Sequence, residues 1–328
     1  MEMRSRALGT GMAVPEQVIT NEDLARIVDT SDEWIVTRTG MKERRRARPD
    51  QAASDLAIPA TLMALEEAQI SAKDLDAIIV ATVTSDTLFP STSCVIQDRI
   101  GARHIPAFDV SAGCTGAIYA LSIADQMIRV GTCRYILVVG VEVLTKITNW
   151  TDRSTCVLFG DGAGAVVLGP SEEADHGIIA FHLASDGGAG HTLHMPAGGS
   201  RLPATHETVD KLLHTLFMRG NEIYRAAVST MTESCRVLID RAGLDADDID
   251  LFIFHQANLR IIEAVAKRLK APSEKVFINI HKYGNTSSAS TLLALHEARM
   301  EGRLKPGNHL LQVAFGAGLT WGGILWKW

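Results

Sequence analysis

Cys114 is the side chain of this sequence best placed to act as a nucleophile. It stands within SAGCTG, residues 111–116, between a predicted strand and a predicted helix. The small neighbours allow a tight turn and the close approach of a substrate. Free N–H groups at the start of a helix stabilise a thiolate, so we expect the pKa of Cys114 to be lowered. The alternative is a buried structural cysteine, which we expect of the cysteines at 94, 133, 156 and 235.

Two polar side chains later in the chain could assist such a nucleophile. His255 follows the apolar run 251–254, and the C-terminal end of a strand is where a sheet presents functional side chains. Asn285 lies in YGNTSSA, residues 283–289, again ahead of a helical pattern. A structural histidine and an ordinary turn with a helix cap remain the alternatives for the two positions.

Glycine-rich and basic segments add further candidates. The segment GDGAG at 160–164 does not fit a dinucleotide site, because an apolar strand at 165–168 follows it rather than a helix. The glycines at 316 and 318 leave N–H groups that could form an oxyanion hole. A basic stripe follows His255 at helical spacing and consists of Arg260, Lys267 and Arg268. It could be a solvated helix face or a surface that binds an anionic partner.

An internal repeat indicates how these residues could be positioned. The apolar run at 75–81 reappears at 249–255, and that at 136–139 reappears at 310–313, both displaced by 174 residues. Between them, the turns that carry Cys114 and Asn285 occupy equivalent places. Apolar runs alternate with helical patterns in each copy, which is typical of sheets covered by helices. We therefore predict two copies of one α/β unit, with Cys114 and Asn285 facing each other.

Composition excludes several classes of protein. The 328 residues carry 32 basic and 38 acidic side chains, so no basic excess favours nucleic acid. No C-x-x-C spacing suggests zinc, and a chain of this length needs no disulfide framework. The longest apolar stretch, 135–144, is interrupted by Gly140 and Glu142 and is too short to span a membrane. We expect no signal peptide, no membrane span and a cytoplasmic location.

Six motifs together resemble the β-ketoacyl-acyl-carrier-protein synthase III family nearly end to end. They lie at residues 29–40, around Cys114, at 159–165 (FGDGAGA), at 255–260 (HQANLR), at 284–287 (GNTS) and at 314–322 (AFGAGLTWG). The resemblance implies an α/β thiolase fold, with two duplicated α/β halves in a layered α-β-α-β-α arrangement. The expected halves are 1–174, with the nucleophile Cys114, and 175–328, with His255 and Asn285.

The resemblance also implies a decarboxylative Claisen condensation that starts fatty-acid synthesis. Cys114 would take an acyl group, expected to be acetyl, from acyl-CoA, with the N–H groups of Cys114 and Gly316 as the oxyanion hole. Malonyl-acyl carrier protein would then lose CO₂, and His255 and Asn285 would donate hydrogen bonds to the developing enolate. The products would be 3-oxoacyl-acyl carrier protein, CO₂ and CoA, with no cofactor, because acyl-CoA is a substrate.

The resemblance also implies which residues bind acyl-CoA and acyl carrier protein. Acyl-CoA would contact a set spread over both halves, and acyl carrier protein would contact the segment after His255 and the nearby basic side chains. The CoA set is Trp34, Arg38, Arg153, Gly220 and Asn258; the carrier set is Gln256, Ala257, Asn258, Leu259, Arg260, Arg225, Lys267 and Arg268. Phe89 would reach the acyl pocket of the partner subunit in a homodimer and shorten it, which favours a short primer.

Two other functions stay open at this point. A pathway-dedicated relative would load another starter or transfer an acyl group in secondary metabolism. A scaffold protein that has lost turnover would keep the thiol without the reaction, but the intact set of Cys114, His255 and Asn285 disfavours it.

Overall fold

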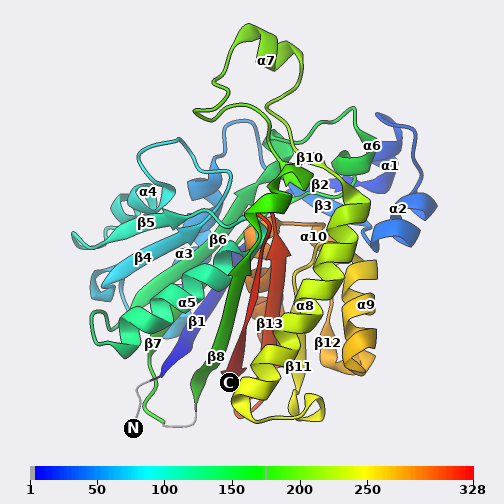
Figure 1. The fold of residues 1–328 in the computed structure, drawn as a ribbon. Helices are drawn as coiled ribbons and strands as arrows, with labels where there is room; N and C mark the ends of the chain where they lie inside the picture. Colours follow the sequence, from blue (N-terminus) through cyan, green and yellow to red (C-terminus); the bar gives the residue numbers. More distant parts are fainter. Residues whose placement is uncertain (1–3, 174–175) are drawn as a thin grey trace.

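Two five-stranded sheets form the body of the molecule (Figure 1). The structure is a computed structural model that describes residues 4–173 and 176–328. The first sheet has the order β1-β7-β6-β4-β5, with bounds Ser5–Ala13, Asp161–Pro170, Ile136–Val143, Ala77–Ala81 and Ala107–Val110. The second has the order β8-β14-β13-β11-β12, with bounds Gly177–Ser185, Thr320–Lys327, His309–Gly316, Leu251–Phe254 and Val276–Phe277. The expected boundary between residues 174 and 175 lies outside the described residues.

The two sheets are copies of one pattern, which confirms the predicted duplication. In each, the third, fourth and fifth strands run parallel and the remaining neighbours pair antiparallel. The register agrees to the residue: Ile78 lies opposite Leu137, and Phe252 lies opposite Leu311, each shifted by the same 174 residues. Equivalent strand ends, and the turns that follow them, therefore meet at the same edge of the molecule.

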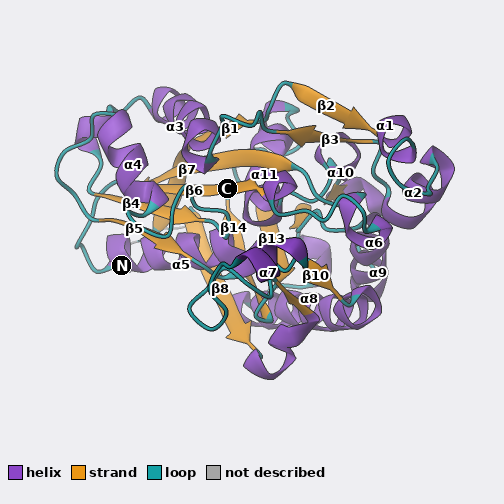
Figure 2. Ribbon diagram, turned by 90° about the horizontal axis from the view of Figure 1, so that it is seen from above, coloured by secondary structure: helices purple, strands orange, loops and turns teal. Residues whose placement is uncertain are grey.

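Helices cover the sheets in layers. The helices α5 (Gly116–Arg129) and α11 (Ser290–Met300) lie between the sheets, and one apolar core joins both helices to both sheets. On the outer faces, α3 (Ala53–Ala68) packs on the first sheet, and α8 (Gly220–Ala242) and α9 (Leu259–Leu269) pack on the second. Figure 2 looks down on these layers, with α3 and α8 on opposite sides. The order is the expected α-β-α-β-α arrangement.

Shorter elements surround the edge where the strands deliver their turns. The remaining strands pair as β2 (Gln17–Thr20) with β3 (Glu43–Arg46) and β9 (Leu193–His194) with β10 (Phe217–Met218). The remaining helices are α1 (Asn21–Ala25), α2 (Asp32–Thr39), α4 (Thr92–Arg99), α6 (Arg153–Cys156), α7 (His206–Asp210) and α10 (Ile280–Tyr283). The segment that carries α7 protrudes at the top of Figure 1.

The glycine-rich segment at 160–164 serves packing. Asp161 already begins β7, so Gly162 and Gly164 lie inside the strand and Gly160 directly precedes it. A Cβ at Gly164 would lie 2.5 Å from the Cβ of Leu292, so only glycine lets the central helix α11 approach the sheet this closely. No helix within the described residues is long and apolar enough to cross a membrane.

Candidate active site

Cys114 lies in a tight turn between β5 and the central helix α5. A single 3₁₀ turn, Gly113–Thr115, connects them and buries the cysteine. Gly113 has φ +54°, and a Cβ there would lie 2.7 Å from the backbone nitrogen of Ala317. A Cβ at Gly316 would lie 2.4 Å from the backbone nitrogen of Cys114. Glycine at both positions thus lets the end of β13 lie against the nucleophile.

His255 follows the last residue of β11 and is 2% exposed. Its backbone nitrogen donates to the carbonyl of Val313 (2.8 Å), and its Nδ1 lies 2.5 Å from the Oγ of Ser290. That Oγ also accepts the N–H of Gln256 (3.4 Å), and we assign the Ser290 hydroxyl as the donor to Nδ1, which places the ring proton on Nε2. Burial lowers the pKa of His255 to about 3, so the imidazole is a neutral hydrogen-bond donor.

Asn285 is fixed through its backbone and its side-chain oxygen. Its backbone nitrogen donates to the carbonyl of Leu158 (2.8 Å), and its carbonyl accepts the N–H of Gly160 (3.0 Å). The Oδ1 atom accepts the N–H of Ser287 at 2.8 Å. With its acceptor engaged in this way, the carboxamide has its NH₂ group available as the donor.

One cavity of about 330 Å³ brings the expected catalytic residues together. Cys114, His255, Asn285 and Gly316 all line it, with the first from one half of the chain and the others from the second half. The turns that carry Cys114 and Asn285 do face each other, as the repeat predicts. Across residues 4–173 and 176–328, no three His, Cys, Asp or Glu side chains gather as metal ligands would.

The expected lowering of the Cys114 pKa is wrong for this structure. Burial raises the pKa of the thiol to about 12, and the negative charge of Glu142 acts in the same direction. Hydrogen bonds from Ser287 and from the backbone of Cys114 and Ala317 act against it. A helix N-terminus contributes roughly 0.3–1 kcal/mol near the surface, whereas full burial shifts a pKa by up to about 3–5 units. The effect of burial on the Cys114 pKa exceeds that of the helix N-terminus, so the resting group is a thiol.

The mouth of this cavity carries the residues expected to bind CoA. Trp34, Arg38, Gly220 and Asn258 line the cavity itself. The guanidinium carbon of Arg153 lies 4.9 Å from the Trp34 ring centroid, and that of Arg38 lies 5.7 Å from it. Asn258 donates from Nδ2 to the carbonyl of Arg38 (3.1 Å), which ties α9 to α2. An aromatic face between two cations suits a planar anionic ligand.

A second, apolar cavity of about 170 Å³ adjoins Cys114 on its other side. Apart from Cys114, the sequence did not single out its lining, which comes from eight separate segments and so has no local spacing. The lining residues are Val83, Gly113, Cys114, Leu144, Ile147, Phe159, Leu193, His194, Met195, Leu216, Ser287 and Ala317. Phe89 does not line it and is 84% exposed in the single chain.

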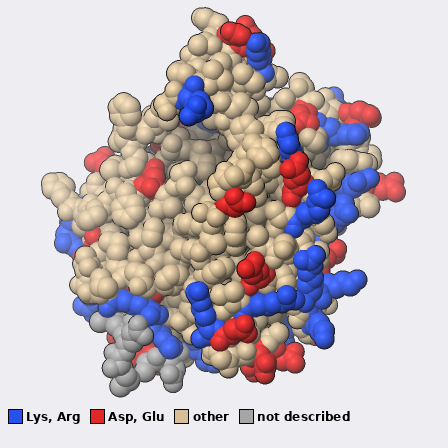
Figure 3. Space-filling model, viewed as in Figure 1, with Lys and Arg blue, Asp and Glu red and all other residues tan. Residues whose placement is uncertain are grey.

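The basic side chains expected to meet the carrier protein are exposed. Arg260, Lys267 and Arg268 point outward from α9, and Arg225 points outward from α8. Figure 3 shows Lys and Arg gathered over this side of the molecule.

Gln256 does not fit the set of residues expected to contact the carrier protein. It is 1% exposed, and its Nε2 donates to the carbonyl of Phe254 (2.7 Å), while its Oε1 accepts the N–H groups of Asn279 (3.1 Å) and Ile280 (3.2 Å). A side chain used inside the protein in this way fixes the turn after β11 and cannot contact a partner.

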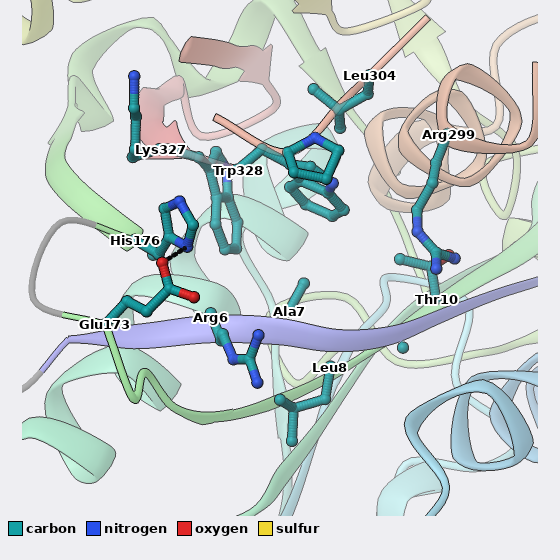
Figure 4. A pocket seen from close by; sticks show the side chains of 14 residues that line it. Arg6, Ala7, Leu8, Thr10, Glu173, His176, Arg299, Leu304, Lys327 and Trp328 are labelled. Atoms are coloured by element: carbon teal, nitrogen blue, oxygen red, sulfur yellow. Dashed lines mark hydrogen bonds and ion pairs between the residues drawn. The ribbon is translucent and has the colours of Figure 1, made fainter. Parts of the chain in front are cut away.

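Another cavity, of about 450 Å³, lies away from these residues (Figure 4). The first residues of β1 and the C-terminal Trp328 line it, and the ion pair between His176 and Glu173 (2.9 Å) borders it. None of the candidate catalytic side chains reaches it, so volume alone does not identify the active site.

Comparisons with known proteins agree on one family. Residues 108–187 match the family described as 3-Oxoacyl-[acyl-carrier-protein (ACP)] synthase III, and residues 239–328 match its C-terminal part. The β-ketoacyl-[acyl-carrier-protein] synthase III of Caldanaerobacter subterraneus subsp. tengcongensis is 56% identical over 321 residues, 98% of this chain and 97% of that protein.

Solved structures agree as well. The 3-oxoacyl-[acyl-carrier-protein] synthase III of Aquifex aeolicus VF5 superposes with a TM-score of 0.92 at 46% identity and covers 99% of this chain and 100% of its own. The priming β-ketosynthase of the R1128 polyketide biosynthetic pathway also has a TM-score of 0.92, at 36% identity, over 99% of this chain and 96% of its own.

The duplicated sheets, with a cysteine at the start of a central helix, define a thiolase-fold condensing enzyme, a class of acyltransferases. Within that class, the chain belongs to the 3-oxoacyl-[acyl-carrier-protein] synthase III family.

Proposed function

We propose that this chain condenses a short acyl-CoA, with acetyl-CoA as the expected primer, with malonyl-acyl carrier protein and thereby starts fatty-acid synthesis. The observation that carries the proposal is the placement of Cys114 between two cavities, one lined by His255 and Asn285 and the other small and apolar. The larger cavity receives the thioester arms, and the smaller, apolar one receives the acyl chain.

In the first half-reaction, Cys114 attacks the acyl-CoA carbonyl and CoA leaves. The N–H groups of Cys114 and Gly316 stabilise the oxyanion, because the close approach of β13 puts both backbone segments beside the sulfur. The acyl chain enters the apolar cavity. An engineered apolar cavity of roughly 150 Å³ holds benzene, so the 170 Å³ available here suits a chain of a few carbons.

In the second half-reaction, malonyl-acyl carrier protein replaces CoA and loses CO₂. The thioester oxygen becomes negative, and His255 and Asn285 stabilise it with hydrogen bonds. A neutral imidazole suits this task, since loss of CO₂ supplies the carbanion and no base is required. The carbanion attacks acyl-Cys114, and the 3-oxoacyl product leaves on the carrier.

Binding follows from the outer residues. Trp34, Arg38 and Arg153 hold the nucleotide end of CoA, while Gly220 and Asn258 border its pantetheine arm. The exposed cations on α8 and α9 meet the acidic carrier protein. Gln256 supports this surface from inside. We also propose a homodimer in which Phe89, exposed in the single chain, closes the acyl pocket of the partner subunit.

Both thioesters are substrates, so the proposed reaction requires no cofactor. We expect the enzyme to work in the cytoplasm, where both thioesters occur. A pathway-dedicated relative is the less supported alternative, because the polyketide priming enzyme is 36% identical, against 56% for the synthase III relative.

The test is to incubate the protein with radiolabelled acetyl-CoA and then with malonyl-acyl carrier protein. We expect label on Cys114 that moves to acetoacetyl-carrier protein. Cys114→Ala must lose the label, whereas Cys94→Ala, which removes the exposed thiol, must keep it. Labelling without condensation would favour the alternative, and absence of labelling in the unaltered protein would refute the proposal.

A further inference from the structure

Glu142 is a wholly buried carboxyl group next to the nucleophile. It lies in β6, between apolar neighbours, and is 0% exposed. Its oxygens accept hydrogen bonds from the hydroxyls of Thr84 (2.6 Å), Ser288 (2.9 Å) and Ser287 (3.1 Å), and from the backbone nitrogen of Val83 (3.2 Å). A charge this deep persists only where donors satisfy it, and the proposed half-reactions do not use it.

Ser287 connects this carboxyl group to the nucleophile. Its hydroxyl donates to Glu142 Oε1 (3.1 Å), and Ser287 lines the apolar cavity together with Cys114, whose thiol pKa the Ser287 side chain lowers. Its backbone has φ +47°, an uncommon conformation for a serine, and the Oδ1 of Asn285 holds its N–H. The turn thus holds a residue of positive φ between the cavity that contains Cys114 and the buried carboxylate.

The thiol proton needs a destination when Cys114 is acylated. Burial keeps the Cys114 pKa high, and His255, with its pKa lowered to about 3, holds a proton poorly. Burial instead raises the pKa of Glu142 to about 7, despite its four kinds of donor. Glu142 therefore exchanges protons near neutral pH, as a proton acceptor should.

The other titratable groups on the surrounding elements are occupied elsewhere. Asp161 of β7 accepts the backbone N–H of Ala47 (2.7 Å) and the Thr145 hydroxyl (2.6 Å). Asp86, on the segment after β4, accepts the N–H and hydroxyl of Ser54 (2.9 and 2.6 Å). The leading causes of the shift in the Glu142 pKa are burial and hydrogen bonds from uncharged groups.

We propose that Glu142 takes up, through the Ser287 hydroxyl, the proton that Cys114 loses on acylation, and returns it after condensation. The inference rests on the proposed function, because it concerns the acylation of Cys114. Glu142 acts through Ser287 and does not touch the substrate.

The proton moves along this relay in one direction on acylation and in the other on condensation. On acylation, the Cys114 S–H bond breaks as the S–C bond forms; the proton passes to Ser287 Oγ, whose own proton passes to Glu142 Oε1. The acyl–CoA C–S bond breaks, and the departing CoA thiolate takes a proton from water. On condensation, the carbanion expels Cys114 as a thiolate, and the proton returns from Glu142 through Ser287.

Immediately after acylation, the enzyme should contain a neutral, buried carboxylic acid that the resting enzyme at pH 8 lacks; because the pKa of Glu142 is about 7, this acid then loses its proton to solvent. Time-resolved infrared difference spectra, recorded during acylation by acetyl-CoA at pH 8, should therefore show a transient carboxylic-acid C=O band that shifts in D₂O. Glu142→Gln and Ser287→Ala should lack the band. Ser288→Ala is the matched control: it removes another hydroxyl from the same carboxylate but leaves the relay, so it should keep the band.

The pH dependence of acylation gives a second readout. The rate in the unaltered protein should fall as pH drops through about 7, because a protonated Glu142 accepts no proton. Glu142→Gln and Ser287→Ala should lose this inflection and acylate roughly 100-fold more slowly; Ser287→Ala changes no charge and guards against misfolding of the glutamine variant. Ser288→Ala should keep the inflection at a higher pH, since it removes a donor that favours the carboxylate.

Two results would overturn the relay. One is acylation of Cys114, followed by mass at pH 8, with no transient carboxylic-acid band during the same time interval. The other is an unchanged pH profile in either relay variant. Both leave the proposed function intact, whereas absence of acyl-Cys114 in the unaltered protein would refute the proposed function itself.

Discussion

Replacing Asn285 with alanine separates the two half-reactions. The amide NH₂ is available to the thioester oxygen because the Oδ1 is engaged by the Ser287 N–H at 2.8 Å. That oxygen gains full negative charge only when malonyl loses CO₂. Removing one donor to a developing oxyanion costs roughly 10²–10³-fold in rate, so decarboxylation should fall by that factor relative to acylation of Cys114.

The same substitution also has a structural cost, which must be separated from the catalytic one. It leaves the buried Ser287 N–H without its acceptor, which should lower the free energy of unfolding by about 1–3 kcal/mol. Asn279→Ala is the matched control: Asn279 is equally buried and donates to Glu297 Oε2 (2.8 Å), but it does not line the cavity. It should lower stability while leaving the ratio of the two rates unchanged.

The assay follows each half-reaction alone. Burst labelling with radioactive acetyl-CoA gives the acylation rate, and release of ¹⁴CO₂ from malonyl-acyl carrier protein gives the decarboxylation rate. If Asn285→Ala lowers both rates by one common factor, Asn285 maintains the shape of the site and does not stabilise the enolate.

Three more predictions concern other parts of the site. Trp34→Ala should raise the KM for acyl-CoA about 3- to 30-fold with little change in kcat, as loss of an aromatic face beside Arg153 would; a fall in kcat alone would contradict this. Leu216→Ala should enlarge the apolar cavity and shift the preferred primer to longer chains in a competition between acyl-CoAs, and an unchanged preference would place the acyl chain elsewhere. His255→Asn should flatten the loss of stability at low pH. The folded-state pKa of His255 is lowered, so between its ordinary value and about 3 the unfolded chain binds a proton that the folded chain does not. Unfolding by denaturant at pH 7 and pH 4 measures the difference; identical pH dependence in both proteins would mean that the imidazole is not held neutral.

The repeat in the sequence was enough to predict two copies of one α/β unit. Matching apolar runs, displaced by 174 residues, become strands with the same neighbours and the same register. Because equivalent strands end at one edge, the turns with Cys114 and Asn285 had to meet there. Pattern and spacing therefore carry the architecture and the position of the site.

Properties that depend on packing could not be read in the same way. The helix start at Cys114 predicts a lowered pKa, but the depth of burial, which only the packed halves create, reverses the sign. Gln256 looks like a surface residue within its motif, yet its side chain turns inward to four backbone groups. The apolar pocket is assembled from separate segments and has no periodic signal.

One residue missed by the sequence analysis left a visible signal. Glu142 interrupts an otherwise apolar strand, and a charge within a buried strand requires partners. Two of its partners, Ser287 and Ser288, come from the other half of the chain, so the sequence alone could not identify them.

The most direct test of the central claim is a crystal structure of the Cys114→Ala variant with a malonyl thioester analogue that cannot lose CO₂. We predict that the thioester oxygen lies within about 2.7–3.2 Å of both His255 Nε2 and Asn285 Nδ2. A thioester oxygen bound away from these two atoms, in a cavity that the analogue nevertheless fills, would contradict the claim that the second half of the chain stabilises the enolate.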